Sequence, residues 1–188
     1  MKSLATIQKL SKIGKILSNI AFVFSVIGFF GCIAGIFSLS FGADNLLKFG
    51  GVTLHGLISE HLGCDAQGVL AALFGWLFVC AGEAVLAKFA ENYFKNELKA
   101  ETPFTFDGAK ELLRLGILTL AIPTGSTIIG RIAEEIAAGL MKVEKAAVMN
   151  MNFDNESSIV LGIMFIIGSL MCRYGAELQE TVNDKAQL

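Results

Sequence analysis

Four long stretches of apolar residues dominate the sequence, and each is long enough to cross a bilayer as a helix. They cover about residues 17–39, 68–89, 111–131 and 158–174 of the 188-residue chain. A transmembrane helix needs about 20 mostly apolar residues, because the hydrocarbon core of a bilayer is about 30 Å thick. Only 17% of the residues are charged, against about 25% in soluble domains. The sequence therefore predicts an all-α integral membrane four-helix bundle, folded as one membrane domain over residues 1–188.

The positions of Lys and Arg predict which ends of the spans face the cytoplasm. Eleven of the fifteen lie in or beside the N-terminal arm at 1–16, the turn at 90–110 and the tail at 175–188. The segments 40–67 and 132–157 contain fewer of them. Because positive residues stay inside, both termini are predicted in the cytoplasm. As a helix, the arm at 1–16 has its apolar residues on one face and its basic residues on the other, which is typical of a helix lying on an anionic lipid surface.

The two outer segments are predicted to carry short amphipathic helices. Apolar residues recur at helical spacing over 54–62, which indicates a short surface helix. A similar pattern follows Arg131, where the third helix either continues beyond the membrane or folds back over the bundle. The polar residues of the first outer segment include His61 and Cys64, whose spacing would allow two metal ligands. No third ligand is suitably spaced, so we expect no metal and no cofactor.

A carboxylate interrupts the second apolar stretch at Glu83. An unpaired carboxylate in the hydrocarbon core costs at least a few kcal/mol, so it should be paired or protonated. Arg114 and Arg173 lie near the cytoplasmic ends of the third and fourth spans and could reach it. The sequence predicts an intramembrane charge pair between Glu83 and one of these arginines, acting as an inter-helix lock. The alternative role for Glu83 is a proton or ion relay.

The third span is the most polar of the four, and it contains a proline at its middle. Pro123 should kink the helix by freeing the carbonyl of Thr119. The hydroxyls of Thr119, Ser126 and Thr127 could either line a transport path or satisfy the groups freed by the kink. In the first span, Gly31 and Gly35 form a GxxxG motif, which favours close helix packing. This motif is consistent with a seam inside the chain or with a homo-oligomer.

Enzymatic and nucleic-acid-binding functions find no support in the sequence. It lacks a nucleophile-elbow, zinc-protease or phosphate-loop motif. The formal net charge is −2, so there is no basic excess for direct binding of nucleic acid. We therefore expect a non-enzymatic protein whose first partner is the lipid bilayer.

The turn before the third span has recognisable loop chemistry. Pro103 should end the helix that leaves the second span, and Thr105 or Asp107 should cap the next helix. Phe104 is expected to anchor the turn at the inner interface. The turn, the N-terminal arm and the tail should meet on the cytoplasmic face. Five residues there are candidates for docking a partner: Pro103, Phe104, Thr105, Tyr174 and Glu177.

Two stretches carry a family resemblance, "ENYFKNELKAETPFTFDGAKELLRLGI" at 91–117 and "CRYGAELQET" at 172–181. Together they resemble an uncharacterised bacterial family of small four-span membrane proteins. The resemblance implies a four-helix membrane fold with both ends inside. It also implies a neighbouring gene for a Cro-repressor-like helix-turn-helix regulator, and it brings no ligand or catalytic residue.

Three functions remain open from the sequence. The leading hypothesis is a membrane partner or sensor of a cytoplasmic transcriptional regulator. The alternative is a small transporter or channel-like subunit that uses Glu83 and the kinked third span. A third is an accessory or immunity subunit of a larger complex.

Overall fold

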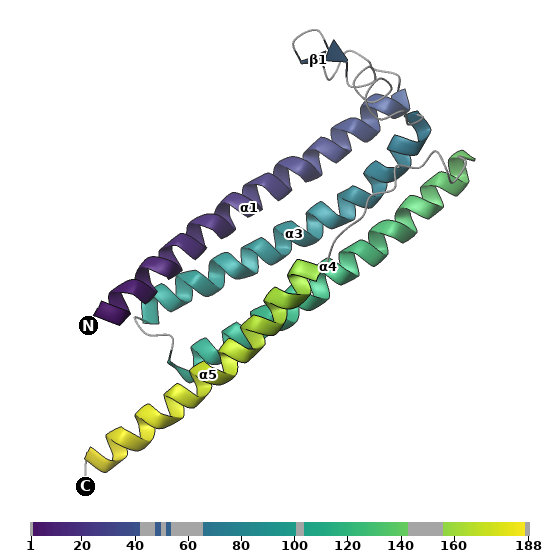
Figure 1. The fold of residues 1–188 in the computed structure, drawn as a ribbon. Helices are drawn as coiled ribbons and strands as arrows, with labels where there is room; N and C mark the ends of the chain where they lie inside the picture. The colour runs from purple at the N-terminus through teal and green to yellow at the C-terminus, as the bar shows by residue number, and fades with distance from the viewer. Residues whose placement is uncertain are drawn as a thin grey trace. The chain divides into compact units, whose positions relative to one another are not determined.

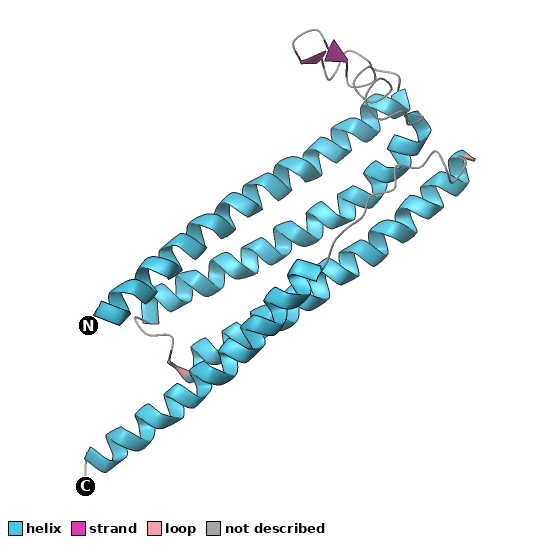
Figure 2. Ribbon diagram, in the orientation of Figure 1, coloured by secondary structure: helices cyan, strands magenta, loops and turns pink. Residues whose placement is uncertain are grey.

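Four long helices make up most of the computed structural model, which describes residues 2–41, 48–49, 52–53, 66–100, 104–142 and 156–186. The helices are α1 (Lys2–Phe41), α3 (Ala66–Ala100), α4 (Phe106–Met141) and α5 (Glu156–Ala186) (Figure 1). The strands β1 (Lys48–Phe49) and β2 (Val52–Thr53) pair antiparallel, and the rest of the described secondary structure is helical (Figure 2). All four helices are long and apolar enough to cross a membrane, which confirms the prediction of a helical protein with four spans.

The helices extend well beyond the predicted spans. α3 has 35 residues, which corresponds to about 52 Å at 1.5 Å per residue. α4 continues to Met141, so the third helix runs on past Arg131 without a break. α1 begins at Lys2 and includes the predicted arm at 1–16 without a break. The predicted outer helix at 54–62, with His61, and the nearby Cys64 lie outside the described residues.

The chain divides into two compact units. The first unit contains Met1–Val23, Glu83–Pro123 and Asn155–Leu188, and the second contains Phe24–Gly82 and Thr124–Asp154. α1, α3 and α4 each contribute to both units, whereas α5 belongs to the first unit alone. The first unit therefore contains segments of all four helices and both ends of the chain. The predicted cytoplasmic segments all belong to this unit.

Small residues at regular intervals form the buried face of α1. Four small side chains, seven residues apart, are each 9% exposed or less: Ser11, Ser18, Ser25 and Cys32. A seven-residue repeat keeps one face of a helix against its neighbour over many turns. In the second unit, a Cβ on Gly28 would lie 3.1 Å from Cys80 Sγ, and one on Gly35 would lie 3.0 Å from Leu73 Cδ1. This small-residue seam therefore packs closely against α3.

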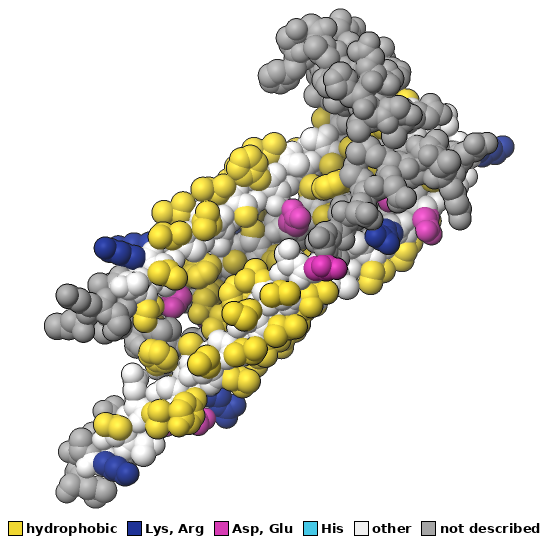
Figure 3. Space-filling view, viewed as in Figure 1, with side chains coloured by type: hydrophobic (Ala, Val, Ile, Leu, Met, Phe, Trp, Pro, Cys, Tyr) yellow, Lys and Arg dark blue, Asp and Glu magenta, His cyan; other side chains and the backbone are white. Residues whose placement is uncertain are grey.

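The other face of α1 carries large apolar side chains that are exposed. Leu10 is 64% exposed, Phe24 is 69% exposed and Phe30 is 63% exposed. Figure 3 shows hydrophobic side chains along much of the visible helix surface. A helix on the surface of a soluble protein has the opposite arrangement, with its apolar stripe facing the core. The exposed face of α1 is therefore suited to contact lipid.

Glycines allow two further pairs of helices to approach closely. In the second unit, a Cβ on Gly130 of α4 would lie 2.8 Å from the carbonyl oxygen of Gly75 in α3. In the first unit, a Cβ on Gly116 of α4 or on Gly162 of α5 would lie 3.0 Å from the carbonyl oxygen of the other glycine. Within membranes, helix association depends on such close packing because lipid supplies no hydrophobic drive.

Candidate functional site

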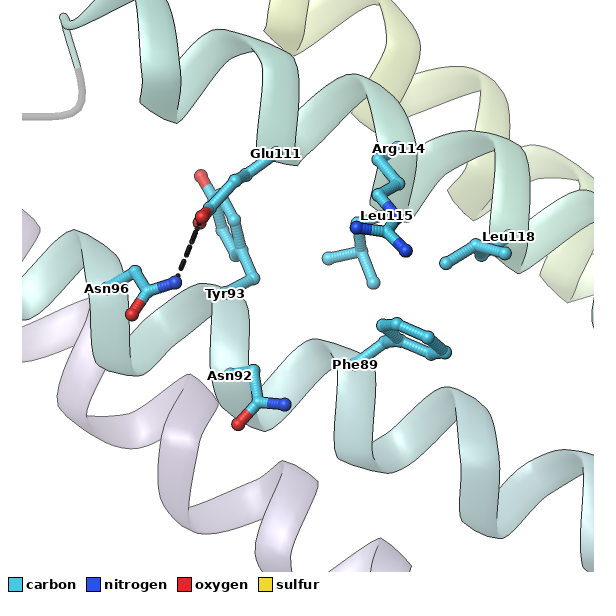
Figure 4. Close-up of a pocket in the computed structure, with 8 residues that line it drawn as sticks. All are labelled: Phe89, Asn92, Tyr93, Asn96, Glu111, Arg114, Leu115 and Leu118. Atoms are coloured by element: carbon cyan, nitrogen blue, oxygen red, sulfur yellow. Dashed lines mark hydrogen bonds between the residues drawn. The ribbon is translucent and has the colours of Figure 1, made fainter.

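A groove between α3 and α4 in the first unit is lined by apolar, polar and charged side chains. Its volume is about 160 Å³. Apolar and polar side chains alternate around it, and Arg114 and Phe89 project toward each other from the two helices (Figure 4). The lining residues are Phe89, Asn92, Tyr93, Asn96, Glu111, Arg114, Leu115 and Leu118. We call this the α3–α4 groove.

The local helix geometry explains why these side chains meet. Positions three, four and seven apart share one face of a helix, which places Phe89, Asn92 and Asn96 together on α3. The same spacing places Glu111, Arg114 and Leu118 together on α4. Beneath them, Tyr93 and Leu115 belong to the buried core of the unit, with 9% and 3% exposure. This packing fixes the backbone on both sides of the groove.

The two charged residues of the α3–α4 groove have different partners. Asn96 Nδ2 donates hydrogen bonds to both carboxylate oxygens of Glu111, at 2.9 and 3.2 Å. The guanidinium carbon of Arg114 lies 5.3 Å from the ring centroid of Phe89, which is a cation–π distance. No ion pair joins Arg114 to a carboxylate in the described part of the chain. Among the described residues, the contact made by the guanidinium of Arg114 is therefore with the Phe89 ring.

A second, more apolar groove adjoins the first. Its volume is about 300 Å³, and we call it the apolar groove. Lys88 Nζ lies 5.2 Å from the Phe22 ring centroid and 2.7 Å from a carboxylate oxygen of Glu91. Both Phe89 and Asn92 line this groove as well as the α3–α4 groove. The full lining is Phe22, Ala84, Val85, Lys88, Phe89 and Asn92.

The predicted charge pair involving Glu83 is not among the contacts of the structure. Glu83 is exposed, and the ion pairs within the described ranges are Lys88–Glu91 and Arg173–Glu177. Arg173 Nε lies 3.2 Å from Glu177 Oε1, one turn along α5. Arg114 packs on Phe89 instead. A bridge from Glu83 to either arginine therefore stays a prediction.

The hydroxyl residues of the third span are buried within the protein. Thr119, Ser126 and Thr127 are each 9% exposed or less. Thr119 Oγ1 donates to the carbonyl oxygen of Leu115 at 2.8 Å, within its own helix. α4 runs through Pro123 without ending. None of these four residues lines either groove, and the bond made by Thr119 matches the interpretation in which the hydroxyls serve the helix itself.

The docking candidates include a helix cap and an inter-helix contact. Thr105 Oγ1 accepts a hydrogen bond from the backbone N–H of Gly108 at 3.0 Å, which confirms its predicted role as the cap of α4. Phe104 lies against α5, because a Cβ on Gly175 would be 2.6 Å from Phe104 Cδ1. Next to Gly175, Tyr174 is 64% exposed. Pro103 lies outside the described residues.

The two glycines of the GxxxG motif have different surroundings. Gly35 packs against Leu73 in α3. A Cβ on Gly31 would meet no heavy atom of the described chain within 4 Å. The seam against α3 therefore includes Gly28, Cys32 and Gly35 rather than both glycines of the motif. A homo-oligomer formed through Gly31 and Gly35 stays a prediction.

Sequence reasoning missed the asparagines of the α3–α4 groove. Asn92 and Asn96 are four residues apart, just after the predicted second span, so a helical wheel extended beyond residue 89 would have paired them. Ser11 was also missed as a polar contact: its side chain hydrogen-bonds to that of Glu97. The serine repeat on α1 was the available signal for this contact.

Comparisons with protein-family models, curated proteins and solved structures find no match. The description of the protein therefore depends on its own residues. Four helices able to span a membrane and an exposed apolar surface define a multi-pass α-helical membrane protein.

Proposed function

We propose that this protein is a non-enzymatic component of the bacterial cytoplasmic membrane that binds a cytoplasmic helix-turn-helix regulator. In this proposal both termini lie in the cytoplasm, and the docking surface is made by the turn before α4 and the middle of α5. The positive-inside distribution of Lys and Arg supports this orientation. The resemblance of residues 91–117 and 172–181 to a family of four-span membrane proteins encoded beside such regulators supports the choice of partner.

One observation carries the proposal: the contact between Phe104 and Gly175. It joins two stretches far apart in the sequence into one surface of the first unit. These are also the two stretches that carry the family resemblance. Phe104 is 38% exposed and Tyr174 is 64% exposed, so both rings remain available to a partner. Aromatic side chains of this kind are enriched among residues that dominate binding energy at interfaces.

Local structure supports a well-defined docking surface. The Thr105 cap fixes the start of α4, and the Arg173–Glu177 pair lies on α5 beside Tyr174. α5 continues to Ala186, twelve residues beyond the predicted end of the fourth span. In the proposed topology this extension projects into the cytoplasm. A partner could therefore contact the helix without entering the membrane.

The experiment is a binding measurement with the purified full-length chain in nanodiscs and the purified helix-turn-helix regulator encoded beside its gene. Phe104→Ala and Tyr174→Ala should each weaken binding by about tenfold or more, the equivalent of about 1.4 kcal/mol. Arg131→Gln, on an exposed part of α4 in the second unit, is the control and should bind as the wild type does. Equal binding by all variants, or no binding by the wild type, would reject the proposal.

Transport is the second candidate, and the contacts described here support it less. The Thr119 hydroxyl is bonded to its own helix, and neither groove includes Glu83. Flux assays in liposomes would separate the two functions. Ion or solute flux that depends on the wild-type chain and is lost in Glu83→Gln would replace the proposal above with transport.

A further inference from the structure

Arg114 has a geometry suited to an anionic ligand. The Phe89 ring covers the guanidinium at 5.3 Å, and no described carboxylate forms an ion pair with it. The nearest acid along α4, Glu111, instead accepts two hydrogen bonds from Asn96. A guanidinium presents several N–H donors in a plane, and these match the oxygens of a phosphate group in pairs. The α3–α4 groove therefore offers the donors of a cationic group to a ligand.

The position of Arg114 along the chain indicates which phosphate is available. It lies one turn into the predicted third span, while Phe89 is the last residue of the predicted second span. The predicted span ends therefore place the α3–α4 groove at the boundary between hydrocarbon and headgroups. Phospholipid phosphates occupy this level, and basic pockets between transmembrane helices bind lipid headgroups.

The apolar groove completes a site of amphipathic shape. It meets the α3–α4 groove at Phe89 and Asn92. From there it follows α3 back through Val85 and Ala84, toward the middle of the predicted second span. Lys88 lies at its polar end, over the Phe22 ring. A headgroup bound at Arg114 would thus have an apolar surface beside it for an acyl chain.

We propose that the two grooves form a binding site for a phospholipid molecule. Arg114 donates hydrogen bonds to the headgroup phosphate, and an acyl chain lies over Phe22, Ala84 and Val85. The proposal goes beyond the docking of a regulator and does not depend on it.

The test uses the purified full-length chain in detergent and three probes. Dioleoylphosphatidylglycerol has both the phosphate and the chains, dioleoylglycerol has the same chains without the phosphate, and inorganic phosphate has no chains. Native mass spectrometry counts the lipid retained, and thermal unfolding reports stabilisation by ligand. We expect phosphatidylglycerol to be retained and to raise the thermal midpoint, with much smaller effects from the other two probes.

Two variants test the residues. Arg114→Gln should weaken retention of phosphatidylglycerol by about tenfold or more, because it removes the charged donor. Ala84→Trp, which fills the apolar groove and leaves Arg114 in place, should weaken it as well. Arg131→Gln is the matched arginine control on α4 and should retain lipid as the wild type does. Circular dichroism and size-exclusion chromatography check the fold of each variant.

The remaining outcomes would overturn the proposal. Equal stabilisation by inorganic phosphate would indicate a site for a soluble anion. Equal retention of dioleoylglycerol would indicate an apolar groove without phosphate recognition. Unchanged retention in Arg114→Gln, or an equal loss in Arg131→Gln, would show that the arginine in the α3–α4 groove does not select the lipid.

Discussion

Phe104 occupies the space that a side chain at Gly175 would need: a Cβ there would lie 2.6 Å from Phe104 Cδ1. The turn before α4 therefore contacts the middle of α5, where the Phe104 ring packs against Gly175. Gly175→Leu should force the ring away and lower the thermal midpoint of the purified protein. Because the obstacle is one side chain, Phe104→Ala should suppress most of this loss. A double-mutant cycle measures the coupling, and additive effects would contradict the contact.

Backbone contact makes Gly130 less tolerant of substitution than Gly125. A Cβ on Gly130 would meet the carbonyl oxygen of Gly75 at 2.8 Å, and that atom moves only if α3 or α4 moves. Gly130→Val should therefore destabilise the protein by about 1–3 kcal/mol, as overpacking does.

Gly125 is the matched control for this prediction, on the same helix. A Cβ there would meet no heavy atom of the described chain within 4 Å. Gly125→Ala should be neutral or stabilising by up to about 1 kcal/mol, because alanine has the higher helix propensity. Unfolding in mixed micelles compares the two variants, and equal effects would argue against close approach at Gly75.

Ser18 is predicted to matter for its size more than for its hydroxyl. Its Oγ donates to the carbonyl oxygen of Gly14 at 2.8 Å, within α1. Ser18→Ala should change the free energy of unfolding by no more than about 0.5 kcal/mol. Ser18→Leu should cost about 1–3 kcal/mol, because the larger side chain enters the seam with α3. The same unfolding assay applies, and a larger loss in the alanine variant would show that the hydroxyl is the stabilising group.

Glu83 is exposed, so replacing it should not open a cavity. We expect Glu83→Leu to leave the thermal midpoint unchanged or to raise it, because a carboxylate in an apolar run is costly. Glu83→Gln serves as the companion variant of similar size. A clear loss of stability in both variants, recovered by also replacing Arg114 or Arg173, would instead support the predicted charge pair.

The spans and the start of α4 could be predicted from the sequence, whereas the full lengths of the helices could not. The predicted stretches all fall inside α1, α3, α4 and α5, because hydropathy detects the length that must match the membrane. Hydrogen bonding propagates a helix through any residue of adequate propensity. The residues after Phe89, which are mostly polar, and those after Arg131, which include Glu134 and Glu135, therefore stay helical.

The contacts of the candidate site were partly predictable. The Thr105 cap follows from a short-range rule, and the same holds for Arg173 and Glu177, four residues apart. Gly31 was expected on the packing seam, but a seven-residue repeat selects Gly28, Cys32 and Gly35 instead. The Arg114–Phe89 contact joins two helices and the Phe104–Gly175 contact joins a turn to a helix, and no local pattern in one sequence indicates which surfaces will meet.

The arrangement of α1 has a consequence for how the protein is made. Many of its bulky residues already face outward, and its fully buried residues are only serine, glycine and cysteine, so the helix needs no other helix to enter the bilayer. It can insert as a complete helix while the rest of the chain is still being synthesised. α3 can then pack later against the small residues of α1. Biogenesis would begin with a stable solitary helix, and assembly would be a separate step that takes place within the membrane.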